Sequence, residues 1–380
     1  MMGLFKINKK LLRQLDFGII VTCCVIAFFG AINILSATQH LNKDPNNPDL
    51  IVFSVFKHQL IMIIAGLVIM YLILLVDYTV IGNYANLIYW FGVFLLVLNA
   101  IMPHAANGAE SWLYIGPVGL QPSEFAKIGM IIMLAKKLDE MEGNINNLKN
   151  FFVLCFYALI PMILIVKQPD MGMTMVCFFI VLGIFFVAGL DLRVIGGGLL
   201  SLVIAIVSVW NSGLIREYQK NRLISFINPE ADPLKTGFQL TQAQIGIGKG
   251  GLLGSGLLKG SWARAGSTPE SSTDFIFSVL GEEWGLVGGA FLLLMYGILI
   301  YKFISIARSS KDIFGSLLCV GISSIFLFSI LENIGMNIGI MPITGITLPL
   351  VSYGGSSVVT AFIAIGLILN VGMRRKKINF

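Results

Sequence analysis

The sequence has little charge for its length. Asp, Glu, Lys and Arg make up 12% of its 380 residues, whereas 56% are hydrophobic and the mean hydropathy is +0.86. Soluble proteins carry about 25% charged residues, so this composition excludes an ordinary soluble enzyme. The net charge of +6 arises partly from Lys and Arg between hydrophobic segments. We therefore expect no nucleic-acid partner and predict a polytopic membrane protein.

Cysteine and histidine are also scarce. All the cysteines lie inside hydrophobic segments, where a thiol behaves as a small apolar group, so no disulfide framework is expected. They are Cys23, Cys24, Cys155, Cys177 and Cys319. His40, His58 and His104 lack the spacing of metal ligands. We predict no metal site of His and Cys and no certain cofactor, and a divalent cation held by carboxylates stays open.

What the sequence has in abundance is hydrophobic segments of membrane-spanning length, which is about 20 residues. They lie near residues 17–37, 54–76, 80–102, 124–138, 150–167, 172–191, 194–211, 284–303, 313–336 and 346–372. They predict an all-α integral membrane protein of about ten transmembrane helices, forming one domain over residues 1–380. A long polar interval, about residues 211–283, separates the seventh helix from the eighth.

Lys and Arg gather in alternate connections between these segments, including both ends of the chain. The positive-inside rule places those connections, and therefore both termini, in the cytoplasm. The other connections, at residues 112–124, 168–171, 211–283 and 339–353, then lie on the outer face. Every unusual polar cluster of the chain is expected on that one side of the membrane.

The first polar cluster leads into the fourth helix. Pro122 suits an early helical position, where its missing N–H costs little. Glu124 and Lys127 lie three residues apart, so they share a helix face and can pair. Because ionisable groups inside a membrane face a polar cavity or each other, the pair either anchors the helix or forms a cavity wall. Trp112 is either an interfacial anchor or a substrate contact.

Two further junctions are rich in turn residues. Asp170 follows Pro169 in a tight turn, and we predict that it caps the next helix. Gly, Pro and Ser are dense between Asn333 and Ser357, which indicates irregular backbone. Irregular backbone at membrane depth occurs only where it is buried in protein or lines a wet cavity, so Ser356 is placed in a cavity wall.

The large polar interval contains a glycine-rich stretch at residues 245–256. It lacks the Gly-Lys-Ser/Thr ending of a Walker motif. Either its backbone approaches a diphosphate, with Lys249, Lys259 and Arg264 supplying positive charge, or it folds back into the membrane. Asp274 closes the interval just before a hydrophobic run, where it is either an N-cap or a general base.

These stretches together resemble the SEDS family of cell-wall polymerases, and its RodA branch more than its FtsW branch. The resemblance is carried by residues 108–127 with QPSE, the QPD at 168–170, NPEADP at 228–233, STDFIFSVLGEEWG at 272–285, NIGMNIGIMPITG at 333–345 and SYGGSS at 352–357. The departure is a Gly-Ser-Thr before Pro269, where relatives tend to have a bulkier apolar residue. It bears on loop packing rather than on the reaction.

The resemblance implies a ten-helix enzyme of the bacterial plasma membrane that polymerises lipid II into β-1,4 glycan strands during cell-wall elongation. Asp274 matches the family's catalytic aspartate, which deprotonates the acceptor hydroxyl while undecaprenyl diphosphate leaves. Glu124 and Lys127 match its polar pair on the fourth helix. The implied partners are a class B penicillin-binding protein and the elongation machinery. From charge alone, we assign Lys249, Lys259 and Arg264 to the diphosphate.

Two other functions fit a many-helix protein with intramembrane charges. A lipid II flippase needs a polar path to the cytoplasmic side, whereas the ionisable clusters here lie on the outer side. A non-catalytic scaffold for a penicillin-binding protein would leave Asp274 as a helix cap.

Overall fold

The computed structural model describes residues 13–41, 52–102, 104–106, 109–115, 118–210, 217–228 and 236–375. The terminal lysines and most of the NPEADP stretch lie outside these residues. The first half contains α2 (Phe17–Ala37), η1 (Gln39–Leu41), α3 (Ser54–Leu75), α4 (Tyr78–Asn83), α5 (Ala85–Ile101), β1 (His104–Ala106), β2 (Ala109–Ile115), β3 (Val118–Leu120), α6 (Pro122–Glu140) and α7 (Leu148–Lys167). The second half contains α8 (Met171–Val187), α9 (Leu192–Trp210), α10 (Glu217–Ile227), α11 (Thr236–Gly250), α12 (Ser261–Arg264), α13 (Ile276–Arg308), α14 (Ile313–Ile338) and α15 (Gly355–Met373).

The helices confirm the helical membrane fold, and each predicted hydrophobic segment overlaps one of them. Within the described residues, six helices are long and apolar enough to cross a membrane: α2 with η1, α3, α7, α13, α14 and α15. Helices α5, α8 and α9 are apolar but shorter in their described parts. A total of ten spans therefore stays a prediction.

Helix starts follow from local capping chemistry, as the sequence indicates. Pro122 occupies the first turn of α6, and Asp170 caps α8 by accepting a hydrogen bond from the Met173 amide at 3.0 Å. Asp16 and Asp312 cap α2 and α14 in the same manner. The predictions for Pro122 and Asp170 are confirmed, because a cap depends on residues close together in the chain.

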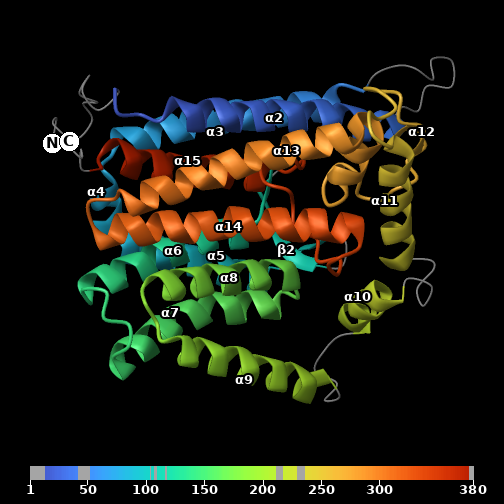
Figure 1. The fold of residues 1–380 in the computed structure, drawn as a ribbon. Helices are drawn as coiled ribbons and strands as arrows, with labels where there is room; N and C mark the ends of the chain where they lie inside the picture. The colour runs from blue at the N-terminus through green and yellow to red at the C-terminus, as the bar shows by residue number, and fades with distance from the viewer. Residues whose placement is uncertain are drawn as a thin grey trace.

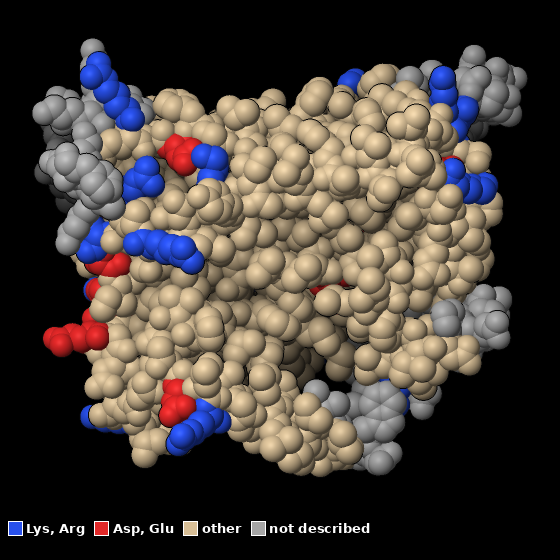
Figure 2. Space-filling model, in the orientation of Figure 1, with Lys and Arg blue, Asp and Glu red and all other residues tan. Residues whose placement is uncertain are grey.

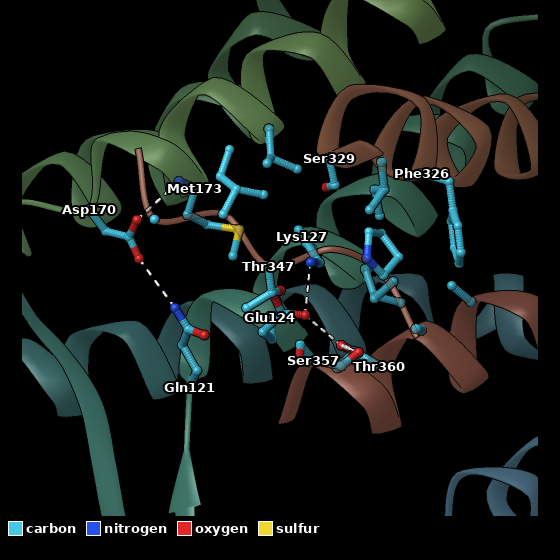
Figure 3. Close-up of a pocket in the computed structure, with 18 residues that line it drawn as sticks. Gln121, Glu124, Lys127, Asp170, Met173, Phe326, Ser329, Thr347, Ser357 and Thr360 are labelled. Carbon is cyan, nitrogen blue, oxygen red and sulfur yellow. Dashed lines mark hydrogen bonds and ion pairs between the residues drawn. The ribbon is translucent and has the colours of Figure 1, made fainter. Parts of the chain in front are cut away.

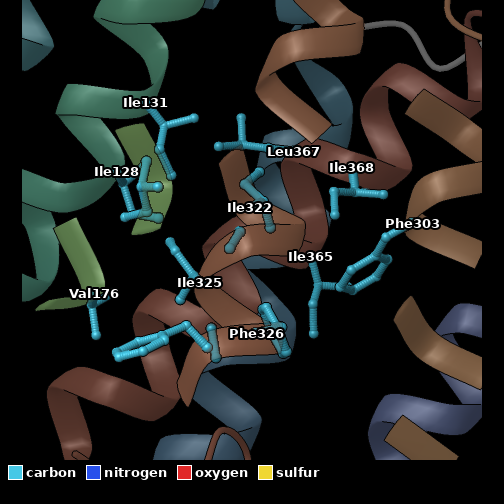
Figure 4. Close-up of a cluster of buried hydrophobic side chains, with 14 of the residues drawn as sticks. Ile128, Ile131, Val176, Phe303, Ile322, Ile325, Phe326, Ile365, Leu367 and Ile368 are labelled. Atoms are coloured by element: carbon cyan, nitrogen blue, oxygen red, sulfur yellow. The ribbon is translucent and has the colours of Figure 1, made fainter. Parts of the chain in front are cut away.

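The long helices lie roughly parallel or antiparallel to one another, with α14 in the middle of the bundle and α11 running across one end (Figure 1). Its buried side chains meet those of α6, α8, α13 and α15, and Figure 4 shows the resulting hydrophobic cluster. Close helix contact depends on small residues: a Cβ at Gly66 of α3 would lie 2.3 Å from the Phe362 ring of α15. This packed core holds the polar end of the bundle in one arrangement.

The two ends of the bundle differ in chemistry. The start of α2 and the end of α15 lie at one end, together with the α6–α7 and α13–α14 connections, while α10, α11, α12 and the strands lie at the other (Figure 1). On the face shown in Figure 2, charged side chains sit mainly towards the two ends and the middle is nearly free of charge. This pattern fits a membrane-spanning bundle, and the assignment of both termini to the cytoplasm stays a prediction.

A small antiparallel sheet in the order β1-β2-β3 is an addition to the predicted all-α architecture. Leu113 pairs with Leu120 and Tyr114 with Gly119. Gly119 permits a close approach, since a Cβ there would lie 3.2 Å from the Trp112 ring. The sheet leads straight into α6 and thereby sets Trp112 over the polar end of the bundle.

The glycine-rich stretch forms backbone hydrogen bonds on both sides of a break in α13. At Gly285, φ is +63°, so the helix is interrupted there. The amides of Leu286 and Val287 donate to the carbonyls of Gly251 and Leu252, at 2.9 and 3.2 Å. On the other side of the break, the amides of residues 255 and 256 donate to the carbonyls of residues 282 and 283.

Glycine is required in this stretch because the two backbones touch. A Cβ at Gly250 would lie 1.9 Å from the Gly281 carbonyl oxygen, and one at Gly254 would lie 2.1 Å from that of Glu283. Contact with α13 therefore accounts for these glycines without a ligand, and a fold back into the membrane stays a prediction.

Candidate active site

A cavity of about 700 Å³ opens at the end of the bundle that carries the strands. Its wall is assembled from α3, β2, β3, the starts of α6, α8 and α15, α10, and the segments before α13 and α15. The polar lining residues include His58, Ser111, Trp112, Gln121, Asp170, Arg222, Glu270, Thr273, Asp274, Thr344, Thr347, Tyr353, Ser356 and Ser357. Segments distant in sequence thus converge on one polar chamber.

Asp274 lies in this wall, just ahead of α13. It is not a cap: the N-cap position belongs to Phe275, and α13 has no side-chain cap of its own. The capping alternative for Asp274 is therefore wrong. Burial in the cavity wall, with a smaller contribution from the Glu270 carboxylate, raises the pKa of Asp274 to about 6. A carboxylate with a pKa near 6 is ionised at neutral pH and still basic enough to accept a proton.

The backbone around Asp274 is bonded to the junction before α15. The Tyr353 amide donates to the Ser272 carbonyl at 2.8 Å, and the Ser352 hydroxyl donates to the Thr273 carbonyl at 2.6 Å. Gly345, with φ of +79°, faces the carboxylate, since a Cβ there would lie 3.4 Å from Asp274 Oδ2. The predicted irregular junction therefore forms one side of the pocket that holds the Asp274 carboxylate.

A narrower pocket of about 50 Å³ shares residues such as Gln121, Asp170 and Thr347 with the cavity and extends deeper into the bundle (Figure 3). Lys127 and Glu124 form an ion pair there at 2.8 Å, and both are buried. Thr360 of α15 donates to Glu124. The predicted pairing is confirmed, and the pair also lines a cavity, so both interpretations of it hold.

Asp170 has a second contact beyond its role as a cap. While one oxygen caps α8, the other accepts a hydrogen bond from the Gln121 side chain at 3.3 Å (Figure 3). Burial is the main cause that raises its pKa. Sequence reasoning identified the cap but missed the cavity, although the QPD stretch that carries the family resemblance was the available signal.

Trp112 and Ser356 both line the large cavity, as the sequence predicts for Ser356 and allows for Trp112. Ser356 accepts from the Gln121 amide at 3.1 Å and donates to the Gly119 carbonyl at 3.3 Å. It therefore ties the strands and the start of α6 to α15. Direct contact of either side chain with a substrate stays a prediction.

The positive charge of the large cavity comes from a residue that sequence reasoning did not single out. Among its described lining residues, Arg222 of α10 is the one Lys or Arg. It donates to the Thr344 carbonyl at 3.2 Å, and its charge acts to lower the pKa values of Asp170 and Asp274. The sequence indicated only that Arg222 is one of several basic residues in the polar interval at residues 211–283.

The three cations chosen from charge alone lie elsewhere. Lys249, Lys259 and Arg264 do not line either cavity. The Lys249 ammonium lies 4.0 Å from the centre of the Trp262 ring and donates to Ser261 at 3.4 Å. Their contact with a diphosphate stays a prediction that the geometry of the described residues does not support.

Comparison with known proteins places this arrangement among cell-wall enzymes. The family model described as "Cell cycle protein", covering FtsW, RodA and SpoVE, matches residues 17–377. Peptidoglycan glycosyltransferase RodA of Treponema pallidum is 32% identical, over 95% of this chain and 98% of that protein. Peptidoglycan glycosyltransferase MrdB of Escherichia coli K12 is 36% identical, over 83% and 84%.

A solved structure described as "Structural coordination of polymerization and crosslinking by a peptidoglycan synthase complex" has a similar fold. Its TM-score is 0.80 at 29% sequence identity, and the match covers 96% of this chain and 99% of that chain. The similarity therefore extends over nearly the whole molecule rather than over single motifs.

Proposed function

The chain belongs to the FtsW/RodA/SpoVE family, and we propose that it is a peptidoglycan glycosyltransferase that polymerises lipid II into β-1,4 glycan strands for cell-wall elongation. The observation that carries the proposal is the cavity of about 700 Å³ with Asp274 in its wall. It offers a polar chamber, a carboxylate and one guanidinium at an end of a membrane bundle. A lipid-linked sugar diphosphate needs all three.

Asp274 acts as the general base in this proposal. Its carboxylate takes the proton from the 4-hydroxyl of the acceptor sugar, whose oxygen attacks the anomeric carbon of the donor. The bond from that carbon to the diphosphate oxygen breaks, and undecaprenyl diphosphate leaves with the electron pair. The configuration inverts, which turns the α-linked donor into a β-1,4 linkage. General-base catalysis contributes typically 10²- to 10⁴-fold to such a step.

Arg222 is the group best placed to stabilise the departing diphosphate. Negative charge develops on the leaving oxygen in the transition state, and a fixed cation stabilises it more strongly in a cavity than in water. Arg222 lines the same cavity as Asp274, whereas Lys249 and Lys259 do not. We assign the diphosphate to Arg222, and Trp112 and Ser356 to the walls around the sugars.

A divalent cation fits this site only together with the substrate. Within the described residues, no group of three or more His, Cys, Asp or Glu side chains could hold a metal. Asp170 and Asp274 supply carboxylates to one cavity, and Mg²⁺ commonly binds through one or two carboxylates plus substrate phosphates. Such an ion would neutralise charge on the diphosphate.

The competing functions find less support in the geometry. A flippase needs a polar route through the bundle, whereas the inner pocket holds about 50 Å³ and abuts the apolar cluster around Phe326. A scaffold in which Asp274 serves as a cap is not consistent with the start of α13, where the N-cap residue is Phe275 rather than Asp274. A class B penicillin-binding protein remains the proposed partner, because a structural relative is described as a synthase complex that couples polymerisation to crosslinking.

The test is glycan synthesis by the purified protein from lipid II in liposomes, with and without a class B penicillin-binding protein. Wild type should make polymer, and Asp274→Asn should make at least about 10²-fold less. Asp191→Asn, the same chemical change at an exposed residue of the α8–α9 connection, serves as the matched control. Equal polymer from Asp274→Asn and wild type would refute the role of Asp274. Transfer of lipid II across the bilayer without polymer would favour the flippase.

A further inference from the structure

Two buried asparagines of α14 bind the backbone of the residue that carries the catalytic carboxylate. Asn333 and Asn337 each donate a side-chain N–H to the carbonyl oxygen of Asp274, at 2.9 and 3.0 Å. Both asparagines have no exposed surface. Neither lines the large cavity, so neither is in a position to touch a substrate there.

We infer that Asn333 and Asn337 are positioning residues, which hold the Asp274 peptide so that its carboxylate is presented to the cavity. This inference rests on the proposed function and assigns a role to the NIGMN stretch, which so far carried only the family resemblance. The two residues differ in their other hydrogen bonds, which connect the Asp274 peptide to different segments.

Asn337 performs the capping that Asp274 does not. Its Oδ1 accepts from the Ser278 amide at 3.1 Å, in the first turn of α13, and the same amide also donates to the Phe275 carbonyl at 3.0 Å. Since this amide is shared between the Phe275 carbonyl and a side chain of α14, it leaves no free N–H here for the Asp274 carboxylate. A short acidic side chain next to a helix start would otherwise be a common partner for such an amide.

Asn333 connects the two segments that face each other across the pocket. Its two amide protons go to the carbonyls of Asp274 and Ile346, at 2.9 and 2.8 Å. Ile346 directly follows Gly345, the residue against the Asp274 carboxylate. One side chain thereby sets the spacing between the catalytic segment and the C-terminal junction.

The Asn333 side chain also has an unfavourable feature, which is a buried acceptor without a partner in the described part of the chain. Its Oδ1 is buried and has no hydrogen-bond partner among the described residues. Leaving a buried acceptor unpaired is unfavourable. Both N–H groups of the Asn333 side chain form hydrogen bonds, whereas its Oδ1 forms none with a described residue. The side chain therefore acts as a hydrogen-bond donor to the two backbone carbonyls.

The variants Asn333→Leu and Asn337→Leu remove the hydrogen bonds with similar volume and no buried charge. We expect kcat for polymerisation to fall about 10²-fold in each, as for a catalytic group displaced by about 1 Å, with little change in KM for lipid II. The acid limb of the kcat profile should move to lower pH, because a displaced carboxylate becomes more solvated.

The matched control is Asn370→Leu. Asn370 is also fully buried and donates to two backbone carbonyls, those of Ile73 and Val76, but at the other end of the bundle. It should lower the melting temperature without changing the pH profile. The inference would be overturned if Asn333→Leu and Asn337→Leu lost no more kcat than Asn370→Leu does for the same loss of melting temperature, and if their pH profiles stayed at the wild-type position.

A second measurement does not depend on activity. Amide hydrogen exchange should rise in the peptide spanning residues 271–278 in both variants and stay at the wild-type level there in Asn370→Leu. Unchanged exchange in this peptide would refute the inference even if the wild type made no polymer. Wild type without polymer would refute the proposed function alone.

Discussion

The charges around Asp274 predict opposite shifts of the pH profile for two substitutions. Glu270 raises the pKa of Asp274 and Arg222 lowers it, on top of the larger effect of burial. Asp170 also raises it and is left unchanged in the experiment. Glu270→Gln removes a negative charge, so the pKa of Asp274 should fall. Arg222→Gln removes a positive charge, so this pKa should rise.

The magnitude follows from the pKa of about 6. The ionised fraction of Asp274 is then about 0.9 at pH 7 and about 0.1 at pH 5, so kcat of the wild type should drop about tenfold over this range. With the ordinary Asp pKa of about 3.9, almost no loss would occur. Glu270→Gln should therefore retain more activity at pH 5, and Arg222→Gln should already lose activity between pH 7 and pH 6.

The assay is the rate of glycan synthesis at saturating lipid II between pH 4.5 and 8, with each profile normalised to its own maximum. Normalisation separates the position of the acid limb from any loss of diphosphate binding in Arg222→Gln. Glu140→Gln, which removes a carboxylate paired with Lys137 at the far end of the bundle, is the control and should leave the limb in place. Shifts of both variants in the same direction, or a wild-type limb near pH 4, would refute the reasoning.

Three further predictions concern other parts of the molecule. Lys127→Met leaves Glu124 buried without its partner and should cost about 3–5 kcal/mol of stability, seen as a lower unfolding temperature in detergent; an unchanged temperature would contradict it. Gly254→Ala should destabilise by more than about 1 kcal/mol, because φ is +79° and the Cβ would meet the Glu283 carbonyl. Gly197→Ala in α9, with nothing within 4 Å, should be neutral or slightly stabilising in the same melting experiment. Lys249→Met should leave kcat/KM for lipid II within about twofold, whereas Arg222→Met should lower it by at least about tenfold in steady-state kinetics. A larger loss in Lys249→Met than in Arg222→Met would mean that Lys249, and not Arg222, binds the diphosphate.

The corrections share a physical origin. A carboxylate just before a hydrophobic run is a good cap from local sequence, but the Ser278 amide donates to Asn337 of α14 and to the Phe275 carbonyl instead. The glycine-rich stretch looks like a phosphate loop, but its glycines allow contact with the broken helix α13. In both cases the deciding partner lies on another element, which local patterns do not contain.

The sequence by itself determined what depends on composition and short spacing. Hydrophobic runs located the helices, Pro122 and Asp170 marked helix starts, and the spacing of Glu124 and Lys127 predicted their ion pair. These features arise within one or two helical turns, so the residues involved are neighbours in any fold that forms the helix.

Only the tertiary structure decided which groups share the cavity. It brought Arg222 rather than Lys249 to the cavity of Asp274, placed Trp112 on a strand at the cavity wall, and bonded Asn333 and Asn337 to the Asp274 carbonyl. Asn333 and Asp274 are separated by 59 residues. Contacts at such separation depend on how whole helices pack, and packing is decided by shape and burial across the bundle rather than by the pattern within any one segment.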